Sequence, residues 1–208
     1  GTEREVNQIK EIFTNRNVKT FKSQLATEAA LKEIDSPHIL HIATHGFFLK
    51  NINVSDANME TRGITKVSND SQTFNDLSSQ KKIKNPLLAS GIALSGANNF
   101  NIDLDIRAEE DGIVSAMEIM GLNLSGTNLV VLSACNTGVG DVERGQGIFG
   151  LRRAFQIAGA KSLLTTLWKI PDRETVDLMR RFYLNLSSGK SKIDSLNLSI
   201  KDTILEIK

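Results

Sequence analysis

Two side chains of this sequence combine chemical reactivity with a place at the end of a predicted buried strand. Cys135, the sole cysteine, comes at the end of the apolar run NLVVLSA and is followed by the small-residue turn NTGVG. His45 comes at the end of a second apolar run, HILHIAT, and is followed directly by Gly46. If the two strands are neighbours in a parallel sheet, a thiol and an imidazole meet at the sheet's carboxyl edge. Open α/β folds place their sites at that edge.

A thiol beside an imidazole is the arrangement that nucleophilic catalysis at a carbonyl carbon requires. The imidazole lowers the thiol pKa or accepts its proton, and the thiolate then attacks. The oxyanion that forms needs backbone N–H donors, and glycine lets a substrate approach the main chain closely. We therefore predict Cys135 as nucleophile, His45 as general base, and the backbone amides of Gly46 and Cys135 as the oxyanion hole. A buried free cysteine that serves as a small apolar residue is the alternative, and the spacing alone does not separate the two.

The bulk composition is that of an ordinary globular protein and limits the partners. The chain has 208 residues, of which 40% are apolar and 24% are charged, with a formal net charge of +1. We expect a single domain over residues 1–208, with no direct nucleic-acid partner and no membrane association, since no apolar run approaches the ~20 residues that span a bilayer. The charged opening, residues 1–10, does not resemble a signal peptide. One cysteine fits a reducing compartment, so a cytoplasmic location is expected.

Apolar runs and amphipathic stretches alternate along the chain. The runs that predict strands are 18–21, 38–44, 87–94, 128–134 and 161–168. The stretches with helical spacing are 4–13, a segment capped by Thr27, 110–122, 148–158, 171–186 and 193–207. This alternation predicts an α/β protein with three layers and a parallel sheet covered on both faces. Residues 50–85 are polar, and we expect them to form a mobile flap near the substrate groove.

Three segments, in this order, resemble the CHAT domain, a caspase-like family of clan CD cysteine peptidases related to separases. They are HILHIATHGFF, PLLASGIALSGAN at 86–98, and the long segment at 109–183 that contains NLVVLSACNTGVG. The resemblance implies a caspase-like α/β/α sandwich with a mainly parallel central sheet, and it assigns His45 and Cys135 as the catalytic dyad. Ser-Ala-Cys-Asn stands where caspases proper have Gln-Ala-Cys, which fits the CHAT and separase branch.

The resemblance also carries expectations about context. The chain begins after the family's usual first strand region and ends before its closing aromatic strand. The sheet is therefore expected to be incomplete at both ends, and flanking regions of the parent protein to be absent. Family members are often found with tetratricopeptide repeats, so a regulatory domain or activator of that type is an expected partner. A protein or peptide substrate, cleaved in a bacterial defence or cell-death pathway, is the implied role.

Substrate recognition is the least determined part of the prediction. In separases, a carboxylate after the tryptophan-containing strand recognises a basic substrate residue. The matching stretch is LWKIPDRET, which makes Asp172 the candidate and Trp168 a pocket wall. Asp111, in the EEDG turn, is a second acidic candidate. Each carboxylate also has a plain explanation, because Asp172 can begin a helix and Asp111 can be a solvated loop residue.

Other motifs do not support competing functions. His38, His41 and His45 are clustered, but on a strand His38 faces away from the other two, so no metal site is expected. The glycines of GVGDVERGQG lack dinucleotide-loop spacing, and SSGKS lacks the first glycine of a phosphate loop. No cofactor is expected. The competing class is a catalytically inactive caspase-like scaffold that binds protein partners.

Overall fold

The computed structural model of this chain describes most of the residues that the sequence assigns to helices and strands. The described residues are 2–48, 53–54, 81–82, 87, 90–97, 111–136, 144–166 and 172–206. Two short strands of the polar stretch belong to them, β2 (Asn53–Val54) and β3 (Lys81–Lys82), which pair with each other. The flap predicted over the rest of residues 50–85 lies outside the described residues.

The centre of the fold is a mixed sheet of five strands in the order β5-β4-β1-β6-β7. Its strands are β1 (Ile39–Phe48), β4 (Ser90–Ala93), β5 (Ile113–Ser115), β6 (Leu129–Asn136) and β7 (Leu163–Thr165). β6 pairs in parallel with both β1 and β7, whereas β4 pairs antiparallel with both β1 and β5. β5 therefore runs in the direction of β1, and β4 is the strand that runs against the others. The expected α/β fold is confirmed, and its sheet is mixed and open, with two parallel and two antiparallel pairings among the described strands.

Two details of the predicted strands are wrong. The parallel prediction fails at β4, which is antiparallel to β1; no helix is predicted between these two strands, and an antiparallel pair needs no helical crossover. Residues 18–21 form no strand, and Phe21 is 46% exposed. A strand requires a neighbour that satisfies its backbone groups, and the local apolar run does not supply one.

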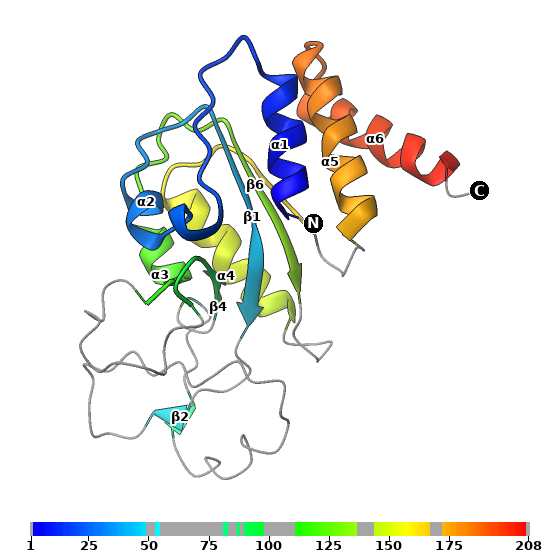
Figure 1. The fold of residues 1–208 in the computed structure, drawn as a ribbon. Helices are drawn as coiled ribbons and strands as arrows, with labels where there is room; N and C mark the ends of the chain where they lie inside the picture. The colour runs from blue at the N-terminus through cyan, green and yellow to red at the C-terminus, as the bar shows by residue number, and fades with distance from the viewer. Residues whose placement is uncertain are drawn as a thin grey trace.

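Helices cover both faces of the sheet, as the three-layer prediction requires (Figure 1). The helices are α1 (Thr2–Ile12), α2 (Glu28–Lys32), α3 (Ala116–Ile119), α4 (Arg144–Ile157), α5 (Asp172–Ser187) and α6 (Lys192–Glu206), with the 3-10 turn η1 (Ser23–Leu25). α1 and α5 lie beside each other on one face, with α6 packed on α5. The short helices α2 and α3 lie with α4 on the other face.

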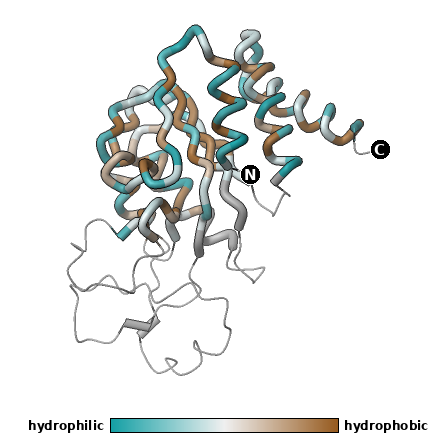
Figure 2. Tube along the Cα trace, in the orientation of Figure 1, coloured by the Kyte–Doolittle hydropathy of each residue, from teal (hydrophilic) through white to brown (hydrophobic). Residues whose placement is uncertain are grey.

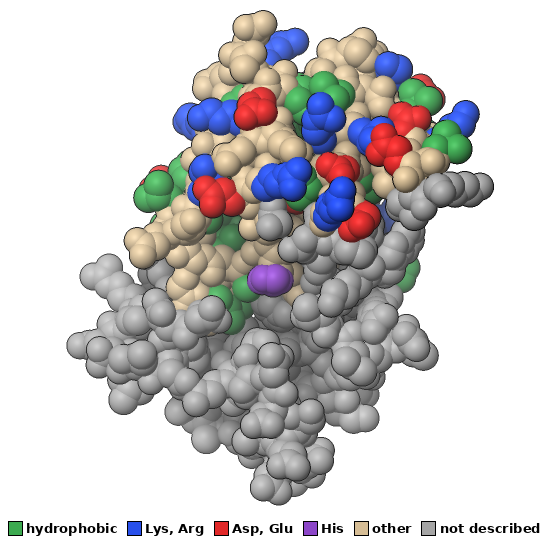
Figure 3. Space-filling view, turned by 45° about the vertical axis from the view of Figure 1, so that its right-hand side comes forward, with side chains coloured by type: hydrophobic (Ala, Val, Ile, Leu, Met, Phe, Trp, Pro, Cys, Tyr) green, Lys and Arg blue, Asp and Glu red, His purple; other side chains and the backbone are tan. Residues whose placement is uncertain are grey.

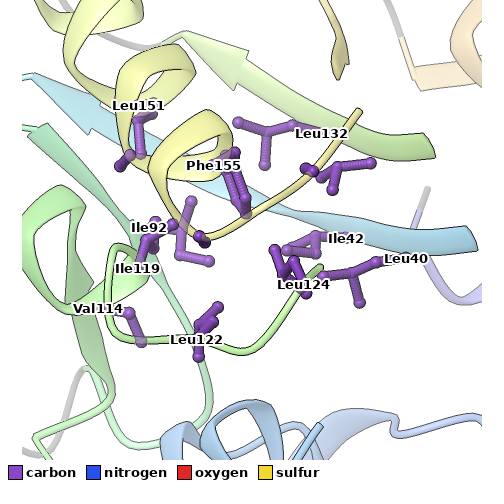
Figure 4. Close-up of a cluster of buried hydrophobic side chains, with 14 of the residues drawn as sticks. Leu40, Ile42, Ile92, Val114, Ile119, Leu122, Leu124, Leu132, Leu151 and Phe155 are labelled. Atoms are coloured by element: carbon purple, nitrogen blue, oxygen red, sulfur yellow. The ribbon is translucent and has the colours of Figure 1, made fainter. Parts of the chain in front are cut away.

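Two apolar clusters, one on each face, hold the layers together. Between the sheet and the α3–α4 layer lies a cluster that includes Leu40, Ile42, Ile92, Val114, Leu132 and Phe155 (Figure 4). Between the sheet and α1 and α5 lies a second cluster, which includes Ile9, Leu129, Val131, Met179, Phe182 and Tyr183. Hydrophobic residues accordingly concentrate along the central strands (Figure 2). β1 and β6 are thus buried on both faces, which explains why their sequences read as nearly continuous apolar runs.

Local signals set several helix ends. The Thr27 hydroxyl accepts from the Ala30 N–H at 3.1 Å and caps α2, as predicted. After α5, Gly189 adopts a φ of +89°, which lets the chain leave the helix in a left-handed conformation. The predicted helix ends therefore follow from capping chemistry that is local in sequence.

The predicted helix over 110–122 is largely wrong. The chain instead forms strand β5 and then the single short helix α3, and Met117, which the helical spacing places on the buried side, is 42% exposed. The helix begins only after Ser115, whose side chain forms a capping box with Glu118. The two β-branched residues Ile113 and Val114 precede that cap and pair with β4.

Candidate functional site

The two strands that carry the predicted catalytic residues are neighbours in the sheet. β1 and β6 pair in parallel from Ile39 opposite Leu129 to Gly46 opposite Asn136. Within this register His45 lies directly opposite Cys135, although ninety positions separate them in the sequence (135 − 45). Hydrogen-bonded strands lie about 4.8 Å apart, so the two backbones approach closely at this row. The sheet thus brings together the backbone positions of the predicted dyad.

His45 occupies a rigid and accessible position. Its strand is central, with β4 on one side and β6 on the other, and His45 pairs with Ala93 of β4 as well as with Cys135. The preceding Thr44 hydroxyl donates to the Ala93 carbonyl oxygen, which adds a link between β1 and β4. The His45 side chain is exposed, whereas Gly46 is buried. For Cys135 the structure describes the backbone alone.

The predicted specificity residues are not gathered at this row. Trp168 lies outside the described residues, and Asp172 begins α5 with its backbone alone described. Asp111 precedes the edge strand β5, which is separated from β1 by β4. Its carboxylate accepts from the Ile113 N–H at 2.8 Å, so it stabilises the turn that starts β5. The roles of these three residues in substrate binding remain predictions.

A buried polar network, which the sequence analysis does not identify, lies on the α1–α5 face of the sheet. Glu5 of α1 is 3% exposed, and its Oε1 lies 3.1 Å from Nε2 of His41. Its other oxygen, Oε2, accepts from the Ser133 hydroxyl of β6 at 3.2 Å. The second ring nitrogen of His41, Nδ1, lies 2.9 Å from the fully buried hydroxyl of Tyr183 in α5. Four elements of the fold therefore meet in one network.

The phenol of Tyr183 stays protonated in this network. Burial, followed by the nearby Glu5 carboxylate, raises the pKa of Tyr183 well above its ordinary value. Its hydroxyl and Nδ1 of His41 form a hydrogen bond in which the donor is set by the tautomer of the imidazole. The Nε2–Oε1 contact is close but not aligned as a hydrogen bond, so it is an electrostatic contact.

The sequence contains a signal for this network. Glu5 lies four residues before Ile9 and so falls on the buried stripe of the first helix. His41 lies at even spacing from His45 and so belongs to the same face of its strand. A charged residue on an apolar stripe indicates a buried polar partner, because an unpaired buried charge is strongly unfavourable.

Replacing Tyr183 with phenylalanine should destabilise the fold without altering its shape. The change leaves Nδ1 of the buried His41 without its hydroxyl partner, which costs about 1–3 kcal/mol. Urea unfolding of the two proteins measures this difference. Ser187→Ala on the same helix is the matched control, since it removes an exposed hydroxyl that donates to the Leu184 carbonyl and should change stability by less than about 0.5 kcal/mol. Equal stability of Tyr183→Phe and the unmodified protein would contradict the network.

The remaining chemistry of the described part of the chain is unremarkable. No described group of three or more His, Cys, Asp or Glu residues could hold a metal ion, and no described helix is long and apolar enough to cross a bilayer. Figure 3 shows acidic and basic side chains interspersed over one face of the molecule, in keeping with the net charge of +1. Nothing on that face concentrates charge of a single sign among the residues described.

Comparisons with known proteins agree with the resemblance noted in the sequence. The family model described as the CHAT domain matches residues 1–200. Tetratricopeptide repeat protein 28 of Mus musculus is 34% identical to this chain over 89 residues, which are 43% of this chain and 4% of that protein. This chain therefore spans a small fraction of that relative. No solved structure matches this chain.

Proposed function

This chain belongs to the CHAT domain family, and from that premise we propose that it is a cysteine endopeptidase domain with His45 and Cys135 as its catalytic dyad. The family is associated with caspase-like cysteine peptidases, and the mixed α/β sheet with helices on both faces is consistent with a caspase-like fold. The observation that carries the proposal is the strand register that sets His45 opposite Cys135.

The chemistry follows from these two groups. His45 accepts the thiol proton, and the sulfur of Cys135 forms a bond to the carbonyl carbon of the scissile peptide. The backbone amides of Gly46 and Cys135 stabilise the oxyanion. Collapse of this intermediate breaks the C–N bond, and His45 donates its proton to the leaving amine. Water then hydrolyses the thioester, with His45 as base, and regenerates the thiol.

The strand-borne placement supports this mechanism physically. A central strand with partners on both sides holds His45 with little freedom, and catalytic geometry depends on such restraint. Exposure of the His45 side chain leaves it accessible to a peptide. The sequence reaches a small-residue turn directly after Cys135, which gives a substrate backbone room to approach.

The proposal extends to substrate, partner and place. The substrate is a specific protein, with Asp172, Trp168 and Asp111 as the groups that would recognise a basic residue beside the scissile bond. A tetratricopeptide-repeat domain or activator would regulate cleavage, which the similarity to a tetratricopeptide repeat protein supports. A cytoplasmic location, where a free thiol stays reduced, and a role in bacterial defence or cell death complete the proposal.

A thiol-reactive peptidyl ketone tests the dyad, because the chain has one cysteine and labelling reports on it alone. We expect the folded protein to be labelled at neutral pH much faster than the same protein in urea. His45→Ala should slow labelling of the folded protein about a hundredfold, the lower range of general acid–base contributions. His38→Ala, which removes an exposed histidine just before β1, is the matched control and should label normally. A folded protein that labels no faster than the denatured one would favour the inactive scaffold instead.

A further inference from the structure

The strands that carry the proposed dyad have apolar side chains on both faces. Along β6, Val130 and Leu132 belong to the cluster under α4, whereas Leu129 and Val131 belong to the cluster under α1 and α5. A one-residue slip exchanges the two faces of a strand. In β6 such a slip would exchange aliphatic residues for aliphatic residues. Hydrophobic patterning therefore specifies the register of this strand only weakly, although the dyad depends on that register.

Two of the polar side chains that interrupt this apolar pattern contact one and the same carboxylate. His41 of β1 lies opposite Val131, and Ser133 of β6 lies opposite Ala43. Both reach Glu5 on α1, His41 at Oε1 and Ser133 at Oε2. Because each strand uses a different oxygen of the same carboxylate, Glu5 bridges β1 and β6.

The bridge is close to the dyad and on the same face of the sheet. Ser133 lies two residues before Cys135, and His41 lies four residues before His45. Residues at even spacing share a face of a strand, so the Glu5 bridge and the His45 side chain belong to one face. At about 3.3 Å per residue, Ser133 is within about 7 Å of the Cys135 position along the strand.

A slip of β6 would break this bridge. If β6 moved by one residue in either direction, Leu132 or Ala134 would take the place of Ser133 opposite Ala43. The Oε2 atom of Glu5 would then lose its hydroxyl donor inside an apolar cluster. Because Oε1 has no hydrogen-bond donor among the described residues either, the slip would leave the whole buried carboxylate without one, which is strongly destabilising, whereas the aliphatic exchange is not. The contact between Glu5 and Ser133 therefore favours the observed register of β6 over registers shifted by one residue, which the apolar residues alone do not distinguish.

We propose that Glu5 is a positioning residue, which fixes the register of β1 against β6 and so keeps His45 opposite Cys135. Its catalytic consequence rests on the proposed function. Tyr183 supports the bridge, because its hydroxyl forms a hydrogen bond with Nδ1 of His41 and so holds the ring whose Nε2 lies beside Glu5. The carboxylate acts through the two strands that it contacts.

The test separates positioning from stability. Glu5→Leu leaves His41 and Ser133 without their carboxylate partner, which lowers stability, but the leucine fills the space among apolar neighbours, so the variant is expected to remain folded. In the unmodified protein, the rate of Cys135 alkylation by iodoacetamide should rise with a midpoint at or below about pH 7, as for a thiol paired with an imidazole. In Glu5→Leu the midpoint should move toward the ordinary thiol value of about 8.5, with a fall of tenfold or more in rate at pH 6.

Two further variants isolate the cause. Glu5→Gln keeps a hydrogen bond to the Ser133 hydroxyl but removes the charge beside Nε2 of His41, so its midpoint should lie between those of the unmodified protein and Glu5→Leu. Ile9→Ala, on the same helix and in the same apolar cluster, should lower stability and leave the midpoint unchanged. A normal midpoint in folded Glu5→Leu would overturn the assignment. If Glu5→Leu fails to fold, Ser133→Ala decides, and a normal midpoint in that folded variant would overturn it equally.

Failure of the dyad itself gives a different result. An ordinary thiol midpoint in the unmodified protein would refute the dyad and leave the register to be tested by amide hydrogen exchange. Exchange of the β6 amides from 129 to 133 should be faster in Glu5→Leu than in Ile9→Ala, because loss of the bridge frees the strand. Equal exchange in the two variants would overturn the role of Glu5 in fixing the register.

Discussion

Cys135→Ala is expected to abolish cleavage of every peptide that the unmodified protein cuts, with a loss of at least about a thousandfold. The alanine keeps the β-carbon and removes only the sulfur, so the bond to the scissile carbonyl carbon cannot form and the residual stabilisation of the oxyanion is all that remains. A peptide library incubated with each protein and followed by mass spectrometry measures the difference. The melting temperature of the variant should stay close to that of the unmodified protein.

The behaviour of combined variants makes this result specific to a dyad. If Cys135 and His45 act as one unit, the double variant with alanine at both positions should be no less active than Cys135→Ala alone, since residues that act together are not additive. His38→Ala changes a histidine that precedes β1 and does not lie opposite Cys135, so it should not reduce cleavage. Persistent cleavage by Cys135→Ala would refute the peptidase assignment.

Gly112→Ala is expected to be the most destabilising of the single-residue changes considered, by about 2–5 kcal/mol. Gly112 has a φ of +76°, which costs a residue with a β-carbon about 1–2 kcal/mol. An added β-carbon would also meet the backbone of the preceding turn, with the Ala97 nitrogen at 2.3 Å and the Ser95 oxygen at 2.7 Å. Relief of such overpacking costs about 1–3 kcal/mol more. Chemical denaturation measures the change in the free energy of unfolding.

Gly189 provides a matched control for this prediction. Its φ of +89° is similarly left-handed, but nothing lies within 4 Å of an added β-carbon. Gly189→Ala should therefore lose only the free energy that a β-carbon costs at a left-handed φ. The additional loss of unfolding free energy in Gly112→Ala then measures the steric clash at Gly112. Equal losses in both would contradict the clash. The position matters for the site, because Gly112 directly precedes β5, whose Ile113 pairs with Ala93, itself opposite His45.

The sequence by itself determined the identity of most elements and the reactive ends of two of them. Apolar runs predicted β1 and β6, helical spacing predicted α1, α4, α5 and α6, and the caps at Thr27 and Gly189 marked helix ends. These features depend on residues a few positions apart, which is the range over which periodicity and capping act. The motif blocks around His45 and Cys135 were sufficient to identify the family that the comparison supports.

Spacing was misleading where local preferences competed. The stretch 110–122 fits a helix by periodicity, yet β-branched Ile113 and Val114 form β5, because the edge of β4 that faces away from β1 is available to them. The antiparallel direction of β4 likewise depends on which strand it meets, and a single run of residues does not contain that information.

Only the tertiary structure decided which residues of distant segments share a row. The register that sets His45 opposite Cys135, and the bridge from Glu5 to His41 and Ser133, join residues separated by up to 128 positions. The apolar runs of β1 and β6 are compatible with more than one alignment, because both of their faces are buried. Their alignment is determined by contacts across the whole chain, whereas the nature of each strand is determined by its own residues.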